Sequence, residues 1–187
     1  MGLEEIRPLY DAWDIELDFA PFFLDPSIPP EGRPRDPQPP DAPPTPVEER
    51  GVTLGLDFRR GRDYTPHTIL ALQAGAFAEH HGTMEQRFNY HRALYRAYFT
   101  DHDNLMDADV LVRHAVEAGL DGDAMRTALT EGTYLEEVQA GIEHAYAIGV
   151  TGIPTFIIND QYAVVGAQPR EVLERVFEQL GGQRREG

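Results

Sequence analysis

The stretch GVTGIPTFIINDQYAVVGAQP, residues 149–169, constrains the fold most strongly because two short strand patterns and a helix start follow one another in it. A loop ends at Pro154, and the apolar strand TFII (155–158) comes directly after it. Asn159-Asp160 is typical of a tight turn, and YAVV (162–165) is the returning strand. Gln168-Pro169 then begins a helix whose apolar stripe is formed by Val172, Leu173, Val176, Phe177 and Leu180.

The first 46 residues predict a helix, a strand and a long loop. LEEIRPLYDAW (3–13) places apolar side chains at helical spacing, and Pro8 makes this helix short or kinked. In IELDFAPFFL (15–24), apolar residues alternate with acids from Ile15 to Phe19, which is the pattern of a half-buried strand. Residues 25–46 hold 10 of the 15 prolines and predict an extended loop without a core of its own.

Residues 65–148 carry the start and stop signals of several helices, as expected for a helical bundle. In chain order these signals are an N-cap at Thr65-Pro66, a capping box at Thr83–Gln86, a start at Asp107, a stop at Gly119, a start at Asp121, a second capping box at Thr133–Glu136 and a stop at Gly149. The element order predicts an α/β fold interrupted by helices. Residues 1–64 and 149–187 form one domain, which includes the proline-rich loop 25–46, and residues 65–148 form an inserted helical subdomain.

The composition excludes several classes of function. The chain has 32 acidic and 16 basic side chains and a net charge of −16, which argues against nucleic acid and anionic membranes as partners. Every basic residue is arginine, cysteine is absent and Ser27 is the single serine. A thiolate, a Schiff-base lysine, a P-loop lysine, a serine triad and disulfides are therefore excluded. Because no long apolar run and no secretory signal are found, the sequence predicts a cytoplasmic protein without a membrane span.

The seven histidines do not show the spacing of metal ligands, so neither a metal nor another cofactor is expected. His80 and His81 are adjacent and point in different directions on a helix, and His114 falls on the apolar face of its helix. The aromatic residues of the helix after Thr83 have two interpretations. Either they form the core of the insertion, or they line a groove above the proline loop. The residues concerned are Tyr90, Tyr95, Tyr98 and Phe99.

Three segments in order carry a resemblance to a known family. VTGIPTFIINDQYAVVGAQP resembles the end of the DsbA-like thioredoxin-fold family, in its FrnE-type or 2-hydroxychromene-2-carboxylate isomerase-like branch. FFLDPSIPPEG (22–32) resembles the phenylalanine- and proline-rich segment of that branch, and LYRAYFTDHDNLMDADVLVRHAVEAGLD (94–121) resembles its helical insertion. The resemblance covers nearly the whole chain from residue 3. It implies a thioredoxin-like fold and a thiol–disulfide oxidoreductase that acts on polypeptides or small thiols.

The resemblance also implies a substrate-binding loop, Thr151, Gly152, Ile153 and Pro154, with a cis peptide bond before the proline. The outward-turned backbone of Ile153 could then pair with an extended peptide as an added strand.

The catalytic residues of the family have no counterpart in this chain. The family places a Cys-x-x-Cys motif, or a single Ser or Cys in the isomerase branch, at the N-terminus of its first helix, where the helix dipole lowers a thiol pKa. That helix corresponds to residues 3–13, so the first strand and the motif would precede Met1. No catalytic residue is assigned, and the expectation is that the native protein starts further upstream.

Without that strand, the sheet would have to close up or accept a strand from a second chain in a homodimer. Two other functions stay open: a cysteine-free peptide-binding module of the same fold, and a glutathione-dependent isomerase whose activating residue also lies upstream.

Overall fold

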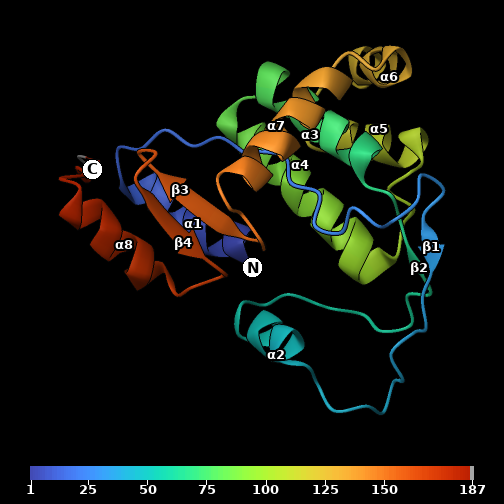
Figure 1. Ribbon diagram of the computed structural model, residues 1–187, viewed down its shortest axis with the longest axis horizontal. Helices are drawn as coiled ribbons and strands as arrows, with labels where there is room; N and C mark the ends of the chain where they lie inside the picture. Colours follow the sequence, from blue (N-terminus) through green and yellow to red (C-terminus); the bar gives the residue numbers. More distant parts are fainter. Residues whose placement is uncertain (186–187) are drawn as a thin grey trace.

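Helices dominate the computed structural model, which describes residues 1–185 (Figure 1). The helices α3 (Ile69–His81), α4 (Met84–Arg96), α5 (Ala108–Glu117), α6 (Gly122–Glu131) and α7 (Leu135–Ala147) form one group, with the π-helical turn η1 (Ala97–Asp101) after α4. A second group contains α1 (Gly2–Ala12), β3 (Thr155–Ile158), β4 (Tyr162–Val165) and α8 (Arg170–Gln179). The short pair β1 (Arg33–Pro34) and β2 (Tyr64–Thr65) and the helix α2 (Pro46–Thr53) lie in the long connection between α1 and α3.

The β3–β4 hairpin consists of the two strands and the turn that the sequence predicts. Thr155 faces Val165 and Ile158 faces Tyr162 in an antiparallel pair. Asn159 and Asp160 both have positive φ, 50° and 52°, and the Gln161 N–H donates to the Ile158 carbonyl at 3.1 Å, which closes a tight turn within the three-residue connection 159–161. The predicted turn and both strands are therefore confirmed.

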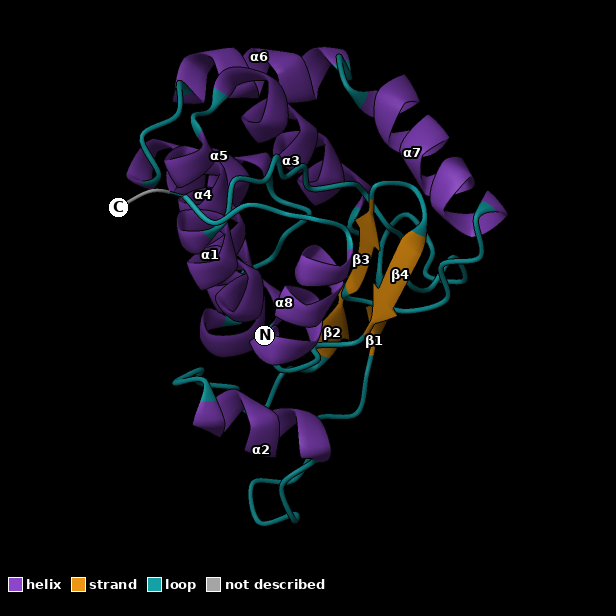
Figure 2. Ribbon diagram, turned by 90° about the vertical axis from the view of Figure 1, so that its left-hand side faces the viewer, coloured by secondary structure: helices purple, strands orange, loops and turns teal. Residues whose placement is uncertain are grey.

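Two helices cover one face of this hairpin (Figure 2). Phe156, Ile158 and Val164 point toward α1 and α8, where they join one apolar cluster. The buried members of that cluster are Ile6, Leu9, Trp13, Phe88, Leu173 and Phe177. Trp13 packs edge-on against Phe177 with the ring centroids 5.5 Å apart, so the end of α1 is fixed to α8.

The helical group has its own core, and most of its predicted caps are confirmed. Thr83 and Gln86 form the reciprocal capping box of α4, and the Asp107 and Asp121 side chains accept backbone N–H groups at the starts of α5 and α6. Gly119 follows α5 with φ of +82°. The core between these helices contains Phe77, Tyr90, Leu111 and Met125, each at most 2% exposed.

Two of the predicted helix starts are wrong. Thr65 does not cap a helix because it pairs with Arg33 in the β1–β2 pair, and α3 begins only at Ile69. Thr133 does not form a capping box either: the cap residue of α7 is Tyr134, which makes no side-chain cap bond. Here the left-handed Gly132, at φ +66°, ends α6 immediately before Thr133 and leaves only a short turn between the helices.

The predicted strand within 15–24 is also corrected. Ile15, Leu17 and Phe19 are half-buried and their acidic neighbours are exposed, so the expected alternation exists. The segment is extended but forms no strand, because no backbone among residues 1–185 lies beside it to complete a ladder. A strand needs a hydrogen-bonded neighbour, and alternation alone does not supply one.

The proline-rich loop 25–46 contains β1, and α2 begins at its last residue. Arg60 organises this region: its guanidinium donates to the carbonyls of Pro39, Pro40 and Pro43 and binds the carboxylate of Glu48. No helix within residues 1–185 is both long and apolar enough to span a bilayer.

Leu111→Ala should lower the free energy of unfolding by roughly 2–5 kcal/mol, because a fully buried leucine is replaced by a cavity. Val116→Ala on the same helix should change it by less than about 0.5 kcal/mol, since Val116 is 58% exposed. Urea unfolding followed by circular dichroism measures both values. Similar losses in the two variants would contradict this description of the helical core.

Candidate functional site

The loop after α7 presents Ile153 and Pro154 at the start of β3. The Ile153–Pro154 peptide bond is cis. The Pro154 carbonyl accepts the Gly166 N–H at 2.8 Å, and the Thr155 hydroxyl donates to the Gly152 carbonyl at 2.7 Å. These two bonds fix the loop to the hairpin, while the Ile153 side chain stays 57% exposed.

The first turn of α1 packs directly on this loop. A methyl group placed on Gly2 would lie 2.7 Å from Cγ and 2.8 Å from Cβ of Pro154, closer than carbon atoms pack. Gly2 is itself buried. The absence of a side chain at this position therefore allows the helix start and the proline ring to touch.

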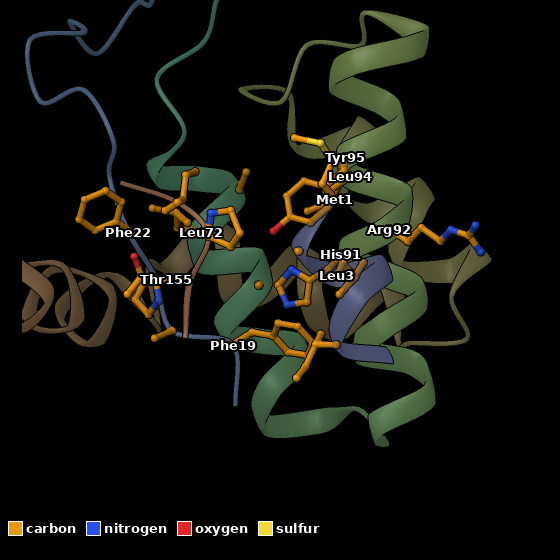
Figure 3. A pocket seen from close by; sticks show the side chains of 18 of the residues that line it. Met1, Leu3, Phe19, Phe22, Leu72, His91, Arg92, Leu94, Tyr95 and Thr155 are labelled. Atoms are coloured by element: carbon orange, nitrogen blue, oxygen red, sulfur yellow. The ribbon is translucent and has the colours of Figure 1, made fainter. Parts of the chain in front are cut away.

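A cleft of about 2520 Å³ opens beside the helix start and the loop (Figure 3). Its lining includes the start of α1, the extended segment 15–19, β3 and the facing sides of α3 and α4, together with residues of η1, α5, α7, α8 and the long connection between α1 and α3. Of the four predicted loop residues, Ile153 and Pro154 line the cleft, whereas Thr151 and Gly152 are not among its lining residues. The segment 15–19 and β3 both border the cleft without pairing to each other.

A polar cluster in the cleft wall was not predicted from the sequence. Glu79 of α3 accepts from Arg87 at 3.2 Å and from the Phe19 backbone N–H at 3.4 Å. Its other oxygen, Oε1, lies 3.5 Å from His91 Nε2, and neither atom has a hydrogen-bond partner within residues 1–185. The ring of His91 also packs on Phe19, with the centroids 4.4 Å apart.

One sequence signal could have indicated that two residues of this cluster lie together. Arg87 and His91 are four residues apart and therefore share a helix face. Glu79 belongs to another helix, so no local pattern connects it to them.

The aromatic residues of α4 and η1 divide between the two predicted roles. Tyr90 is fully buried in the helical core, and burial raises the pKa of its hydroxyl. Tyr95, Tyr98 and Phe99 line the cleft, and Tyr95 is 50% exposed.

His114 and His80 pair with carboxylates. His114 is buried, as predicted, with Nδ1 2.9 Å from Glu117 and Nε2 3.2 Å from Asp103. His80 lies 2.8 Å from Glu137. Within the described chain, no group of three or more histidine, aspartate or glutamate side chains is arranged to hold a metal ion.

Comparison with known proteins places this arrangement in a family. A family model described as the DSBA-like thioredoxin domain matches residues 1–178. The chain belongs to this family. Its fold is accordingly the DsbA-like thioredoxin fold, with β3, β4 and α8 as the C-terminal part of the α/β unit.

Individual relatives agree with this assignment. The uncharacterized protein YwbO of Bacillus subtilis is 31% identical over 167 residues, which cover 88% of this chain and 82% of that protein. The crystal structure of a probable DsbA oxidoreductase from Streptomyces coelicolor is similar with a TM-score of 0.62 and 31% identity. That match covers 71% of this chain and 57% of the Streptomyces chain, less than two thirds of its length. A candidate protein disulfide isomerase from Nitrosomonas europaea shares the fold, with a TM-score of 0.56 and 17% identity.

Gly2→Ala should lower the free energy of unfolding by about 1–3 kcal/mol, because the added methyl group overlaps the Pro154 ring. Gly152→Ala is the matched control: apart from its chain neighbours, no atom of residues 1–185 lies within 4 Å of the position that its methyl group would take. Thermal and urea unfolding of both variants provide the comparison. If Gly2→Ala were as stable as Gly152→Ala, the described contact between α1 and the loop would be wrong.

Proposed function

We propose that this chain binds extended polypeptides at the Thr151–Pro154 loop, as the substrate-binding part of a DsbA-like thiol–disulfide oxidoreductase. The observation that carries the proposal is the backbone of Ile153. No group within residues 1–185 hydrogen-bonds to its N–H or its C=O, and its side chain is 57% exposed. A free backbone edge beside an apolar side chain is what an added strand requires, with main-chain bonds for affinity and side-chain contacts for selectivity.

The surroundings of the loop support an apolar polypeptide as the ligand. Ile148 and Val150, just before the loop, line the same cleft, and so do Phe22 and Leu72 on neighbouring segments. Ile148 is 49% exposed. Burying side chains of this kind against an apolar ligand contributes roughly 1.5–3 kcal/mol for each one fully covered.

The redox half of the proposed function needs a group from outside these 187 residues. Thiol–disulfide exchange proceeds by attack of a thiolate on a disulfide sulfur, and this chain contains no cysteine. The chain alone therefore binds but does not exchange. The printed names of the Streptomyces and Nitrosomonas proteins support the oxidoreductase class. The resemblance of residues 22–32 and 94–121 supports the FrnE-type branch and, with it, a cytoplasmic location.

Ile153→Asp should weaken polypeptide binding roughly tenfold or more, because it replaces an exposed apolar contact by a carboxylate. The probe is a fluorescein-labelled insulin B chain with both cysteines carboxymethylated, so that binding is measured without thiol chemistry. Fluorescence anisotropy gives the dissociation constant. Val52→Asp is the matched control, since Val52 is 75% exposed, belongs to α2 and is not among the residues that line the cleft.

Wild-type protein and Val52→Asp should bind the probe equally well. Circular dichroism and thermal unfolding establish that Ile153→Asp is folded, as its exposure leads us to expect. Equal affinities of the wild type and Ile153→Asp would contradict the proposed site.

A homodimer belongs to the same proposal, because the segment 15–19 and β3 have backbone edges without a ladder partner within the described chain. Such edges pair readily with a second chain. Sedimentation velocity should show a mass that rises from monomer to dimer with protein concentration. A monomer mass at every concentration would contradict the dimer. It would not affect the proposed binding of polypeptides at the loop.

A further inference from the structure

A second, smaller pocket of about 230 Å³ lies next to η1, and arginines dominate its charged lining. Glu48 is the single acidic residue among the described residues that line it. Four of the 16 arginines of the chain line this pocket: Arg35, Arg59, Arg60 and Arg62. This concentration contrasts with the whole chain, in which acidic residues outnumber arginines 32 to 16.

The β1–β2 pair brings two of these arginines together. Arg33 faces Thr65 and Pro34 faces Tyr64 in the antiparallel register. The pairing continues one step further, because the Arg35 N–H donates to the Asp63 carbonyl at 2.8 Å. Arg35 therefore lies across from the chain segment that carries Arg62, although 27 positions separate them in the sequence.

The one carboxylate of the pocket is already neutralised. Arg60 binds Glu48 through two bonds, Nε to Oε1 at 2.9 Å and Nη2 to Oε2 at 3.0 Å. The same carboxylate accepts the Thr45 N–H at 2.7 Å. These bonds, with the Arg60 guanidinium first among them, lower the pKa of Glu48 to about 2. Glu48 and Arg60 together contribute no net charge, so the remaining arginines determine the sign of the pocket.

Two of the remaining arginines have no carboxylate partner. Arg59 lies 3.3 Å from Asp57, but no carboxylate within residues 1–185 comes within 4.0 Å of the nitrogens of Arg35 or Arg62. Arg62 is packed on the ring of Tyr98, 3.8 Å from its centroid, and its Nε and Nη1 are buried without an acceptor. Burial lowers the pKa of Arg62 by more than the neighbouring Tyr98 raises it, and the charge of Arg35 acts in the same direction as burial.

A guanidinium that is half-buried beside another cation is costly unless an anion compensates it. We propose that this pocket binds a phosphate group, which Arg35 and Arg62 contact. The charge supports a dianion over a monoanion: two uncompensated guanidinium groups match the roughly −1.5 to −2 charge that a phosphate monoester carries at neutral pH. Planar guanidinium groups also suit phosphate oxygens because they donate several N–H bonds in one plane. None of the loop residues 151–154 lines this pocket, although Arg35, Tyr98 and Phe99 line both it and the large cleft, so the phosphate proposal does not depend on the polypeptide loop.

The test is a titration of the protein with inorganic phosphate at pH 7.5. Isothermal titration calorimetry and thermal unfolding are the two measurements of binding. Every sample is kept at one ionic strength with sodium chloride, because salt by itself screens the self-repulsion of a chain with net charge −16. Acetate is titrated in parallel as a monoanion, and phenyl phosphate as a monoester. The ester distinguishes a phosphate carried by a larger molecule from free phosphate.

We expect saturable binding at one site, with affinity for phosphate or its ester at least about tenfold above that for acetate. Arg62→Gln and Arg35→Gln should each weaken it about tenfold or more, since each removes one charged donor. Arg175→Gln is the matched control, because Arg175 is exposed on α8 and outside the pocket. Its affinity should equal that of the wild type.

Arg35 is exposed, so Arg35→Gln keeps the test decisive even if Arg62→Gln were to disturb the packing on Tyr98. Three results would each overturn the proposal: no saturable binding of either phosphate compound, equal binding of acetate, or an Arg35→Gln affinity equal to that of the wild type.

Discussion

The packing of α1 between the hairpin unit and α4 is the interaction on which the rest of the structure depends. On one side, Ile6 and Leu9 join Leu173 and Phe177 in the apolar cluster under the hairpin. On the other side, Tyr10 packs against Phe88 of α4, with the ring centroids 5.7 Å apart. An isolated two-stranded hairpin is marginally stable in water, so β3 and β4 depend on this helix and on α8 for their stability. The packing of α1 also places Gly2, in the first turn of the helix, against Pro154 of the loop.

The same packing explains why a large cleft exists beside the loop. The α1 helix connects the helical group to the hairpin by packing against both. However, β3 and the segment 15–19 do not pair with each other. The space between them is bordered by backbone edges on two sides and by α3 and α4 above. Glu79 lies in this wall and satisfies the Phe19 N–H, which shows one way in which the exposed edge of the segment is compensated.

The features that could be predicted from the sequence are those with local causes. The Asn159-Asp160 turn, the Thr83 capping box and the caps at Asp107 and Asp121 each depend on residues a few positions apart. The errors arise where distant partners decide. Thr65 pairs with Arg33 in a strand and does not cap a helix. The alternating segment from Ile15 to Phe19 lacks the neighbouring strand that would make it part of a sheet. Glu79 with His91, and Arg35 with Arg62, meet only through tertiary structure, so no spacing in the sequence reveals them.

The contact between Gly2 and Pro154 separates binding from reactivity in this architecture. A thiol at the N-terminus of a helix is activated by the helix dipole and by free N–H groups. In this fold the N-terminus of α1 already lies against the proline ring, closely enough to exclude a side chain at Gly2. The contact between the helix start and the loop is therefore built without any contribution from a thiol. Because this geometry comes from apolar packing and backbone bonds, the proposed binding surface does not require a cysteine.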